Sequence, residues 1–370
     1  MSRIIISGGG TGGHIFPALA IAHYIKKKNP NAEVLFIGAN GRMEMKRIPE
    51  AGFNIEGLDV FGIRRDISWS GIKSNLKLPF MLISTVRKAK RIMNSFKPDI
   101  VIGVGGYASG PALRAAQELK IPTIIQEQNS YPGKTNKWLS KKVAKICVAY
   151  DGLEFFFPKQ KIVMTGNPVR EEIINFKPNL KEAYEFFNLA STKKTVLVIG
   201  GSQGSQTINQ VVLDFIDDFE KLDCQLIWQT GDFYYKSNEA QLSGLISKKV
   251  KIAPFINRMD FAYSAADYIV SRAGALTISE LAIVGLPAIL IPLPTAAEDH
   301  QTANAKQLSD AGAAILLPDI ESKKLFTILV NLMSDFETST RMEKNIRSFA
   351  KPDAIMRIVE VISKFVNIKI

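Results

Sequence analysis

Cysteine is scarce in this sequence, with two residues in 370, Cys147 and Cys224. Both lie in apolar runs typical of strands, so core packing in a reducing compartment is favoured over a disulfide or a metal site. The sequence also lacks an apolar run of the ~18 residues that a membrane-spanning helix needs. A strand pattern starts directly after Met1-Ser2, so we expect no signal peptide. These absences predict a cytoplasmic protein.

Acidic residues are scarce in the first half of the chain. Residues 1–168 hold 25 Lys and Arg against 11 Asp and Glu, a net charge of +14, whereas the remaining residues hold 22 against 24, a net charge of −2. The basic half is expected to face an anionic partner, and both nucleic acid and a lipid surface fit that charge. The sequence has no zinc knuckle, helix-turn-helix signature or ribonucleoprotein motif, which argues against nucleic acid.

Apolar strand-like runs alternate with helical stretches, which predicts parallel α/β layers. A chain of 370 residues exceeds the usual size of one hydrophobic core, and the strand series restarts after the turn residues at 165–170. We predict two doubly wound, Rossmann-like domains, residues 1–165 and 166–350, and a helix within 351–370 that packs back toward the first domain. The predicted strands are Arg3–Ser7, Glu33–Ile37, Ile100–Gly103, Thr123–Ile125, Lys145–Val148 and Ile162–Met164, then Thr195–Ile199, Gln225–Trp228, Val250–Ile252, Tyr268–Val270, Ala288–Ile291 and Ala313–Leu316.

Glycine-rich loops follow several of these strands. Residues 8–14 read Gly-Gly-Gly-Thr-Gly-Gly-His before a predicted helix at Ile15–Lys27, and residues 103–107 and 200–204 are similar. A fourth turn, at 271–275, precedes a buried helix. Glycine lets the backbone approach an anion, and a helix start supplies N–H donors. The loops therefore predict a phosphate-binding edge at the carboxyl ends of the strands.

The first loop also matches a dinucleotide fingerprint in its spacing, Gly8-x-Gly10-x-x-Gly13. The second strand, however, ends at Ile37-Gly38 without the acidic residue that the ribose of a nicotinamide nucleotide would need. This difference argues against NAD binding.

Six motifs occur in one order and together resemble the MurG family of UDP-N-acetylglucosamine transferases. The resemblance runs from residue 1 to the final helix. It implies a GT-B fold, in which two Rossmann-like domains enclose an interdomain cleft, with the lipid acceptor on residues 1–165 and the UDP-N-acetylglucosamine donor on residues 166–350. The motifs are Gly-Gly-Gly-Thr-Gly-Gly-His at 8–14, Gly103-x-Gly-Gly-Tyr-x-Ser-Gly-Pro111, Glu127-Gln128-Asn129, Gly166-Asn-Pro-Val-Arg170, Gly200-Gly-Ser-Gln-Gly204 and residues 271–280.

The family activity implied is inverting transfer of N-acetylglucosamine from UDP to the 4-hydroxyl of undecaprenyl-diphospho-N-acetylmuramoyl-pentapeptide, a step of peptidoglycan synthesis. Glu280 would hold the ribose diol, and the backbone of Ile256 would recognise the uracil edge. One position departs from some relatives, which carry His where Gln126 stands. The donor-binding residues implied by the resemblance are Thr11, Gly12, Gly13, Asn129, Arg170, Ser202, Ile256, Ala275, Leu276, Thr277, Ile278, Ser279, Glu280 and Gln301.

Inverting transfer needs a base for the acceptor hydroxyl. His14 is the first candidate, because a helix start disfavours imidazolium and keeps the ring able to accept a proton. The alternative is a histidine that only packs the loop. Glu127 is the rival base, with an alternative role as a hydrogen-bond acceptor within its loop. His300 ranks third, and His23 lies mid-helix and is interpreted as structural.

The leaving diphosphate also needs stabilisation. The Asp-x-Asp triplet that metal-dependent transferases often use is absent from the sequence. Loop amides, Ser202 and the helix start at Ala275 could hold the diphosphate, with Arg170 adding a charged contact. We therefore expect neither a metal site nor a bound cofactor, although a divalent cation in solution could still assist.

Residues 73–91 combine apolar side chains with a basic end, and Trp69 lies just upstream. Such a stretch can lie in a bilayer interface, although a buried helix with a solvated basic end has the same pattern. The lipid acceptor favours the interface, so we expect a peripheral protein on the cytoplasmic face of the inner membrane. Its expected partners are the two substrates, the anionic membrane surface, and cell-wall synthesis and division proteins.

Three rival functions remain open from the sequence. The first is another GT-B glycosyltransferase. A related sugar-nucleotide epimerase would isomerise UDP-N-acetylglucosamine without an acceptor. A catalytically silent GT-B scaffold would recruit partners to the membrane and would fail to bind UDP.

Overall fold

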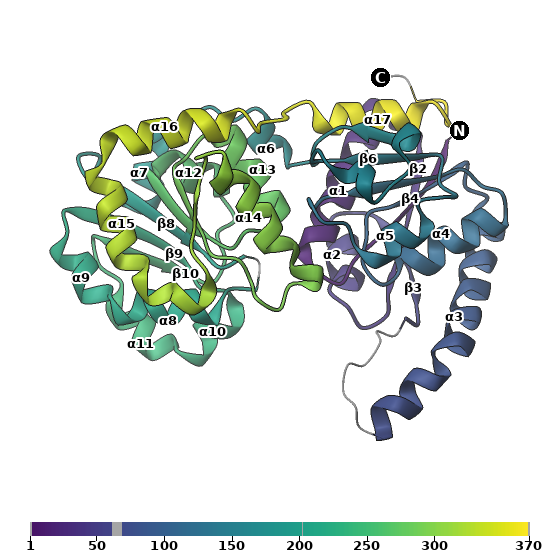
Figure 1. Cartoon of the computed structure of the whole chain (residues 1–370), viewed down its shortest axis with the longest axis horizontal. Coiled ribbons are helices and arrows are strands. Elements are labelled where there is room, and N and C mark those ends of the chain that lie inside the picture. The colour runs from purple at the N-terminus through teal and green to yellow at the C-terminus, as the bar shows by residue number, and fades with distance from the viewer. Residues whose placement is uncertain (1, 61–68, 202, 369–370) are drawn as a thin grey trace. The chain divides into compact units, whose positions relative to one another are not determined.

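The structure is a computed structural model that describes residues 2–60, 69–201 and 203–368, and within them the side chains of all residues except 69–80, 220 and 297. The chain divides into two compact units (Figure 1). Unit 1 is Met1–Arg170 with Asp353–Ile370, and unit 2 is Glu171–Pro352. The division falls after Arg170, whereas the sequence pattern predicts it after residue 165.

Unit 1 contains a parallel sheet in the order β3-β2-β1-β4-β5-β6-β7. Successive side chains of β1 point to opposite faces of the sheet. Ile4 and Ile6 therefore belong to the core on one face, and Ile5 belongs to the core on the other. The strand patterns omit β3, an edge strand that carries Glu56 and is only partly buried. The strands are β1 (Arg3–Ser7), β2 (Glu33–Ala39), β3 (Asn54–Leu58), β4 (Ile100–Gly103), β5 (Thr123–Glu127), β6 (Lys145–Val148) and β7 (Ile162–Met164).

Helices cover both faces of this sheet. The C-terminal helix α17 packs against α1, and its Ile358 and Ile362 are buried with Ile21 in one core (Figure 1). On the other face, α3 and α4 bury Ala89 and Leu113. The helices are α1 (Gly12–Lys28), α2 (Glu44–Glu50), α3 (Trp69–Phe96), α4 (Ser109–Glu118), α5 (Lys134–Leu139) and α17 (Ala354–Ser363), with short 3₁₀ turns at Leu153–Phe155 and Lys159–Lys161.

Unit 2 repeats this plan with a parallel sheet in the order β10-β9-β8-β11-β12-β13. Leu197 of β8 belongs to the core on one face, and Val196 and Val198 to the core on the other. The strands are β8 (Lys194–Ile199), β9 (Cys224–Gln229), β10 (Val250–Ala253), β11 (Tyr268–Ser271), β12 (Ala288–Leu290) and β13 (Ile315–Leu316). The helices are α6 (Glu171–Ile174), α7 (Leu180–Phe187), α8 (Gln206–Asp214), α9 (Ile216–Lys221), α10 (Asp232–Ser237), α11 (Glu239–Leu245), α12 (Met259–Ala265), α13 (Ala275–Val284), α14 (His300–Asp310), α15 (Leu325–Ser334) and α16 (Phe336–Arg347), with 3₁₀ turns at Ala297–Asp299 and Asp319–Lys324.

Each sheet reverses its winding at one place. In unit 1, β1 pairs with β2 on one side and with β4 on the other, and in unit 2, β8 lies between β9 and β11 in the same way. Ligands of open parallel sheets bind beyond the carboxyl ends of the strands at such switch points. Both pairs of glycine loops, after β1 and β4 and after β8 and β11, lie at these places. The two doubly wound units confirm the predicted fold class.

Candidate active site

The first glycine loop of unit 1 is held by a buried carboxylate. Glu44, at the start of α2, is completely buried; its Oε2 accepts from Gly10 N at 2.8 Å, and its Oε1 accepts from Ala39 N at 3.0 Å. A loop amide that donates to a carboxylate is not available to a phosphate. The loop is therefore less open to an anion than its glycine content predicts.

His14 is the third residue of α1, and its ring is fixed by the same loop. His14 Nδ1 lies 3.1 Å from the carbonyl oxygen of Gly9 and 3.4 Å from Thr11 Oγ1. A carbonyl oxygen can only accept, so a hydrogen bond between these two atoms requires the tautomer with the proton on Nδ1, in which Nε2 is the basic nitrogen. A side chain on Gly105 would begin 2.7 Å from the imidazole Cδ2, so glycine there makes room for the ring.

Thr11, Gly12 and Gly13 lead from this loop into α1. Thr11 is the N-cap residue in an extended conformation, and both Thr11 and Gly13 are exposed, whereas Gly12 is buried. The predicted donor contacts at Thr11 and Gly13 therefore lie on an accessible part of the loop, next to His14 in the chain.

Glu127, the rival base, ends β5 and is buried. Its Oε1 accepts from the backbone and side-chain nitrogens of Asn129, at 3.1 and 3.2 Å, and its Oε2 accepts from Gly133 N at 3.2 Å and Asn136 Nδ2 at 2.8 Å. Burial raises the pKa of Glu127, and the hydrogen bonds to the carboxylate oppose that rise. Four donors from one loop favour the alternative role, in which Glu127 orders residues 127–136 and orients Asn129.

Gln126, where some relatives carry His, is completely buried. Its side-chain amide donates to Asn167 Oδ1 at 3.1 Å, and Asn167 Nδ2 donates to the carbonyl oxygen of Gln128 at 3.0 Å. Gln128 Nε2 donates to the carbonyl oxygen of Val104 at 2.8 Å. This network joins the segments after β4, β5 and β7, so Gln126 has a structural role. Arg170, the last residue of unit 1 before the division, is exposed.

In unit 2, Gln229 at the end of β9 ties two predicted donor segments together. Ile256 N donates to Gln229 Oε1 at 2.9 Å, and Gln229 Nε2 donates to the carbonyl oxygen of Gly201 at 3.2 Å. A uracil carbonyl could accept a hydrogen bond from Ile256 N only if the Gln229 side chain moved away. Ser202, in the same glycine loop, lies outside the described residues.

The helix α13 begins at the switch point of unit 2. Its N-cap is Gly274, and no side chain in the described part of the chain caps it, so the first-turn amides from Ala275 onward are suited to an anion. Glu280, in the second turn, is buried and accepts a hydrogen bond from Tyr263 OH at 2.8 Å. The structure therefore fixes the predicted ribose carboxylate through a residue of α12.

Replacing Tyr263 with Phe is expected to weaken UDP binding about tenfold, because a hydrogen bond to a charged group contributes about 1.5–3 kcal/mol and orients the Glu280 carboxylate. Titration calorimetry with UDP measures the change. Tyr150→Phe is the matched control, since the Tyr150 hydroxyl is buried and has no hydrogen-bond partner among the residues described. Equal UDP affinity in both variants would contradict the role assigned to Tyr263.

Arg272, directly after β11, is buried and makes an ion pair with Asp319. Its Nη1 also donates to the carbonyl oxygens of Ile291 and Pro292, at 3.1 and 3.0 Å. The guanidinium thus ties together the segments that follow β11, β12 and β13. Its charge is neutralised by Asp319, so the neutral amides of α13 remain the main anion donors here. Nearby, Gln301 Oε1 accepts from Leu293 N at 3.0 Å.

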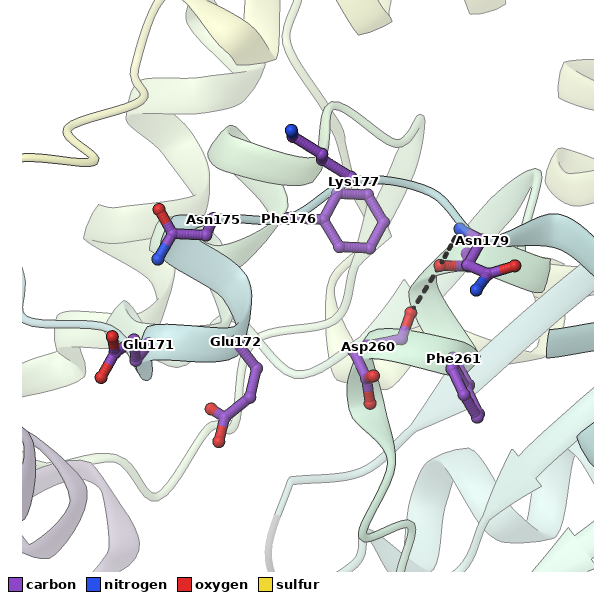
Figure 2. A pocket seen from close by; sticks show the side chains of 9 residues that line it. Glu171, Glu172, Asn175, Phe176, Lys177, Asn179, Asp260 and Phe261 are labelled. Atoms are coloured by element: carbon purple, nitrogen blue, oxygen red, sulfur yellow. Dashed lines mark hydrogen bonds between the residues drawn. The ribbon is translucent and has the colours of Figure 1, made fainter. Parts of the chain in front are cut away.

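A cavity of about 480 Å³ lies elsewhere in unit 2, between α6, the segment before α7 and the start of α12 (Figure 2). Its lining includes the carboxylates of Glu171, Glu172 and Asp260, and hydrogen bonds from Arg258 lower the pKa of Asp260. The lining holds one cation, Lys177, against these three carboxylates, and the excess of negative charge disfavours a nucleotide diphosphate. None of the predicted donor residues lines the cavity, which is therefore not the donor site.

Five residues that hold the loops of the two units are not among the predicted site residues: Glu44 in unit 1, and Gln229, Tyr263, Arg272 and Asp319 in unit 2. Arg272 and Gln229 carry a usable signal, since each is a polar residue at the carboxyl end of a buried strand. The other three act through contacts with segments distant in sequence. In the described part of the chain, no group of three or more His, Cys, Asp and Glu is arranged to hold a metal ion.

Known proteins resemble this chain over its whole length. Residues 4–148 match the glycosyltransferase family 28 N-terminal domain, and residues 195–358 match the glycosyltransferase family 28 C-terminal domain. The chain is 50% identical to the UDP-N-acetylglucosamine–N-acetylmuramyl-(pentapeptide) pyrophosphoryl-undecaprenol N-acetylglucosamine transferase of Cytophaga hutchinsonii, across 99% of this chain and 97% of that protein.

Solved structures agree with this assignment. The crystal structure of Acinetobacter baumannii MurG is similar with a TM-score of 0.76 and 30% identity, covering 98% of this chain and 100% of that one. The UDP-GlcNAc 2-epimerase of Neisseria meningitidis, solved with UDP-GlcNAc bound, has a TM-score of 0.67 at 17% identity, covers 98% of this chain and 100% of its own, and shares the fold alone. The predicted GT-B fold and family resemblance are confirmed: the chain belongs to glycosyltransferase family 28, in the MurG family of N-acetylglucosamine transferases.

Proposed function

We propose that the chain is a hexosyltransferase that moves N-acetylglucosamine from UDP-N-acetylglucosamine to the 4-hydroxyl of undecaprenyl-diphospho-N-acetylmuramoyl-pentapeptide, a step of peptidoglycan synthesis. The observation that carries the proposal is the 50% identity, over nearly the full chain, to a transferase whose name states this donor and this acceptor. The geometry of both units fits the chemistry that such a transfer needs.

For the donor, we propose that unit 2 holds the diphosphate on the first-turn amides of α13 and the ribose on Glu280. Helix N-termini favour anions, and the nearby carboxylate of Asp319 is neutralised by its ion pair with Arg272. Ile256 would meet the uracil edge, and Ser202, Gln301, Asn129 and Arg170 complete the set that the family resemblance implies. In this arrangement the protein needs no bound metal or cofactor for the leaving group.

For the reaction, we propose that His14 is the general base. Nε2 takes the proton of the acceptor 4-hydroxyl while that oxygen attacks the anomeric carbon, and the bond from this carbon to the diphosphate oxygen breaks as UDP leaves. One displacement inverts the anomeric centre. The hydrogen bond of Nδ1 to the Gly9 carbonyl supports this role because it directs the lone pair to Nε2. Glu127 is less suited, because its oxygens already accept four hydrogen bonds.

For the acceptor side, we propose that α3 rests on the cytoplasmic face of an anionic membrane. Leu82 and Ile83 expose 43% and 49% of their surface, and Arg87 is exposed a turn further on. In contrast, Lys90 pairs with Glu118 at 2.6 Å, so part of the basic end is neutralised. No helix among the residues described is long and apolar enough to cross a membrane. Cell-wall synthesis and division proteins remain proposed partners.

Replacing both Leu82 and Ile83 with Glu is expected to weaken binding to vesicles rich in phosphatidylglycerol at least about tenfold, because the apolar area no longer leaves water and two anions meet the headgroups. Co-sedimentation with vesicles measures the change. Phe336→Glu in α16 is a matched control, with a side chain that is 82% exposed in unit 2. Unchanged vesicle binding in the double variant would contradict the membrane role of α3.

The proposed function is tested by incubating the protein with labelled UDP-N-acetylglucosamine, with and without lipid-linked muramoyl-pentapeptide. Formation of the lipid-linked disaccharide, and release of UDP only when the acceptor is present, are the expected results. Isomerised sugar nucleotide without an acceptor would instead indicate an epimerase. Failure to bind UDP would indicate a catalytically silent scaffold.

A further inference from the structure

One peptide group of unit 1 connects two functional side chains. The peptide between Gly9 and Gly10 has its N–H on Gly10 and its carbonyl oxygen on Gly9. The N–H donates to Glu44 Oε2 at 2.8 Å, and the carbonyl oxygen accepts from His14 Nδ1 at 3.1 Å. The N–H and C=O of a trans peptide point in opposite directions, so the carboxylate and the imidazole lie on opposite sides of one planar unit.

The packing leaves this peptide little freedom. A side chain on Gly9 would begin 2.2 Å from the Glu44 carboxyl carbon, and a side chain on Gly106 would begin 2.2 Å from the Gly9 carbonyl oxygen. Gly106 has a φ of 85°, a conformation that favours glycine. The peptide therefore lies between Glu44 on one side and the backbone of Gly106 on the other, and its orientation is fixed by both.

The burial of Glu44 and its hydrogen bonds allow it to affect His14 as well as the loop. The carboxylate is completely buried, and its second oxygen is held by Ala39 N at the end of β2. Burying a carboxylate is unfavourable unless its partners stabilise the charge. A chain of hydrogen bonds polarises each member, so an ionised carboxylate on the N–H makes the carbonyl oxygen of the same peptide a stronger acceptor.

We propose that Glu44 is a positioning residue that acts on His14 through the Gly9–Gly10 peptide. It holds the proton of the neutral imidazole on Nδ1, fixes the ring plane and raises the basicity of Nε2. In Ser-His-Asp enzymes a carboxylate does this by direct contact with the histidine; here a peptide group stands between them. The proposal deepens the proposed function and rests on the role of His14 as the base.

Other groups around the ring define the alternative. Thr11 Oγ1 lies 3.4 Å from Nδ1 and could donate to it if the proton were on Nε2. Tyr107, in the segment after β4, is a titratable side chain close to the loop. A side chain on Gly10 would begin 3.8 Å from Tyr107 Cδ2. If Thr11 rather than the Gly9 carbonyl set the tautomer, Glu44 would have no route to Nε2.

The first experiment is nitrogen NMR of the imidazole groups in the wild-type protein. The sequence has three histidines, so His23→Gln and His300→Gln variants assign the His14 signals. The expected result at neutral pH is a proton on Nδ1 and none on Nε2. A proton on Nε2 would overturn the proposal. This measurement needs no substrate and no variant at Glu44, so it stands even if Glu44 variants fold poorly.

The second experiment compares Glu44→Gln with Asp99→Asn. Asp99 also accepts from a backbone amide, that of Arg3 at 2.7 Å, but at the amino ends of the strands β1 and β4, whereas Glu44 contacts the loop at the carboxyl end of β1. In Glu44→Gln, the loss of charge is expected to lower the pKa of His14 by about half a unit to one unit, seen in the NMR titration and in the acid limb of the kcat profile. The plateau kcat is expected to fall about 10- to 100-fold, with the donor KM nearly unchanged. Asp99→Asn should change neither.

These readouts separate failure of the inference from failure of the proposed function. If His14→Ala abolishes turnover but Glu44→Gln leaves the tautomer, the His14 pKa and kcat unchanged, the inference is wrong and the base assignment stands. If His14→Ala retains turnover while Glu44→Gln still shifts the His14 pKa, the connection between Glu44 and His14 stands and the base assignment is wrong.

Discussion

Replacing His14 with Ala is expected to lower kcat by about 10²- to 10⁴-fold, the usual contribution of a positioned general base. The ring sits at the start of α1, where the helix end disfavours the imidazolium ion, and its Nδ1 is committed to the Gly9 carbonyl. Without the imidazole, the acceptor hydroxyl has to lose its proton to water. Initial rates at saturating donor and acceptor measure the loss.

The matched control for this prediction is His23, which lies in the same helix as His14. His23 packs edge-on against Phe53, with ring centroids 5.0 Å apart, so His23→Ala should act on stability and leave kcat largely intact. UDP affinity should be nearly the same in His14→Ala and in the wild type, because His14 is proposed to act on the acceptor hydroxyl, and the proposed ribose and uracil contacts, Glu280 and Ile256, lie in unit 2. A His14→Ala variant that binds UDP normally and retains most of its turnover would exclude His14 as the base.

Much of the fold is predictable from local sequence because it depends on local patterns. The central runs of β1, Ile4–Ile6, and of β8, Val196–Ile199, are apolar and mostly β-branched, as parallel strands buried on both faces require. β3 differs, since an exposed Asn54 and a half-covered Ile55 lie on an edge strand that needs less apolar surface. Its place is set by pairing with β2, which no local pattern of β3 contains.

The contacts that hold the site depend on distant residues. Glu44 reaches Gly10 across 34 positions, and Ile256 reaches Gln229 across 27. The second strand ends without an acidic residue that could bind a ribose. The nearest carboxylate after it, that of Glu44, accepts a hydrogen bond from Gly10 in the glycine loop. Glycine content alone predicts an open anion site here, and the fold closes part of it with a carboxylate.

Replacing Arg272 with Met is expected to lower the free energy of unfolding of unit 2 by about 3 kcal/mol, because removal of one partner leaves the other charge uncompensated. The Arg272 side chain is 8% exposed and that of Asp319 is 17% exposed, so some hydration of the carboxylate keeps the loss near the lower end of the usual range. Asp319 also accepts from Thr207 Oγ1 at 3.1 Å, which partly offsets the loss.

Urea unfolding followed by the fluorescence of Trp228, which is completely buried in unit 2, measures this change after the other two tryptophans are replaced by Phe. Arg341→Met is the control, because its pair with Glu337 is exposed and 3.9 Å long, and such pairs contribute less than about 1 kcal/mol.

The double variant Arg272→Met with Asp319→Leu separates the effect of charge from that of packing. It should recover more than half of the lost free energy of unfolding, since no buried charge then remains unpaired. If the double variant is as unstable as Arg272→Met, the hydrogen bonds of Arg272 to Ile291 and Pro292, rather than its ion pair, hold the segments after β11 and β12 together.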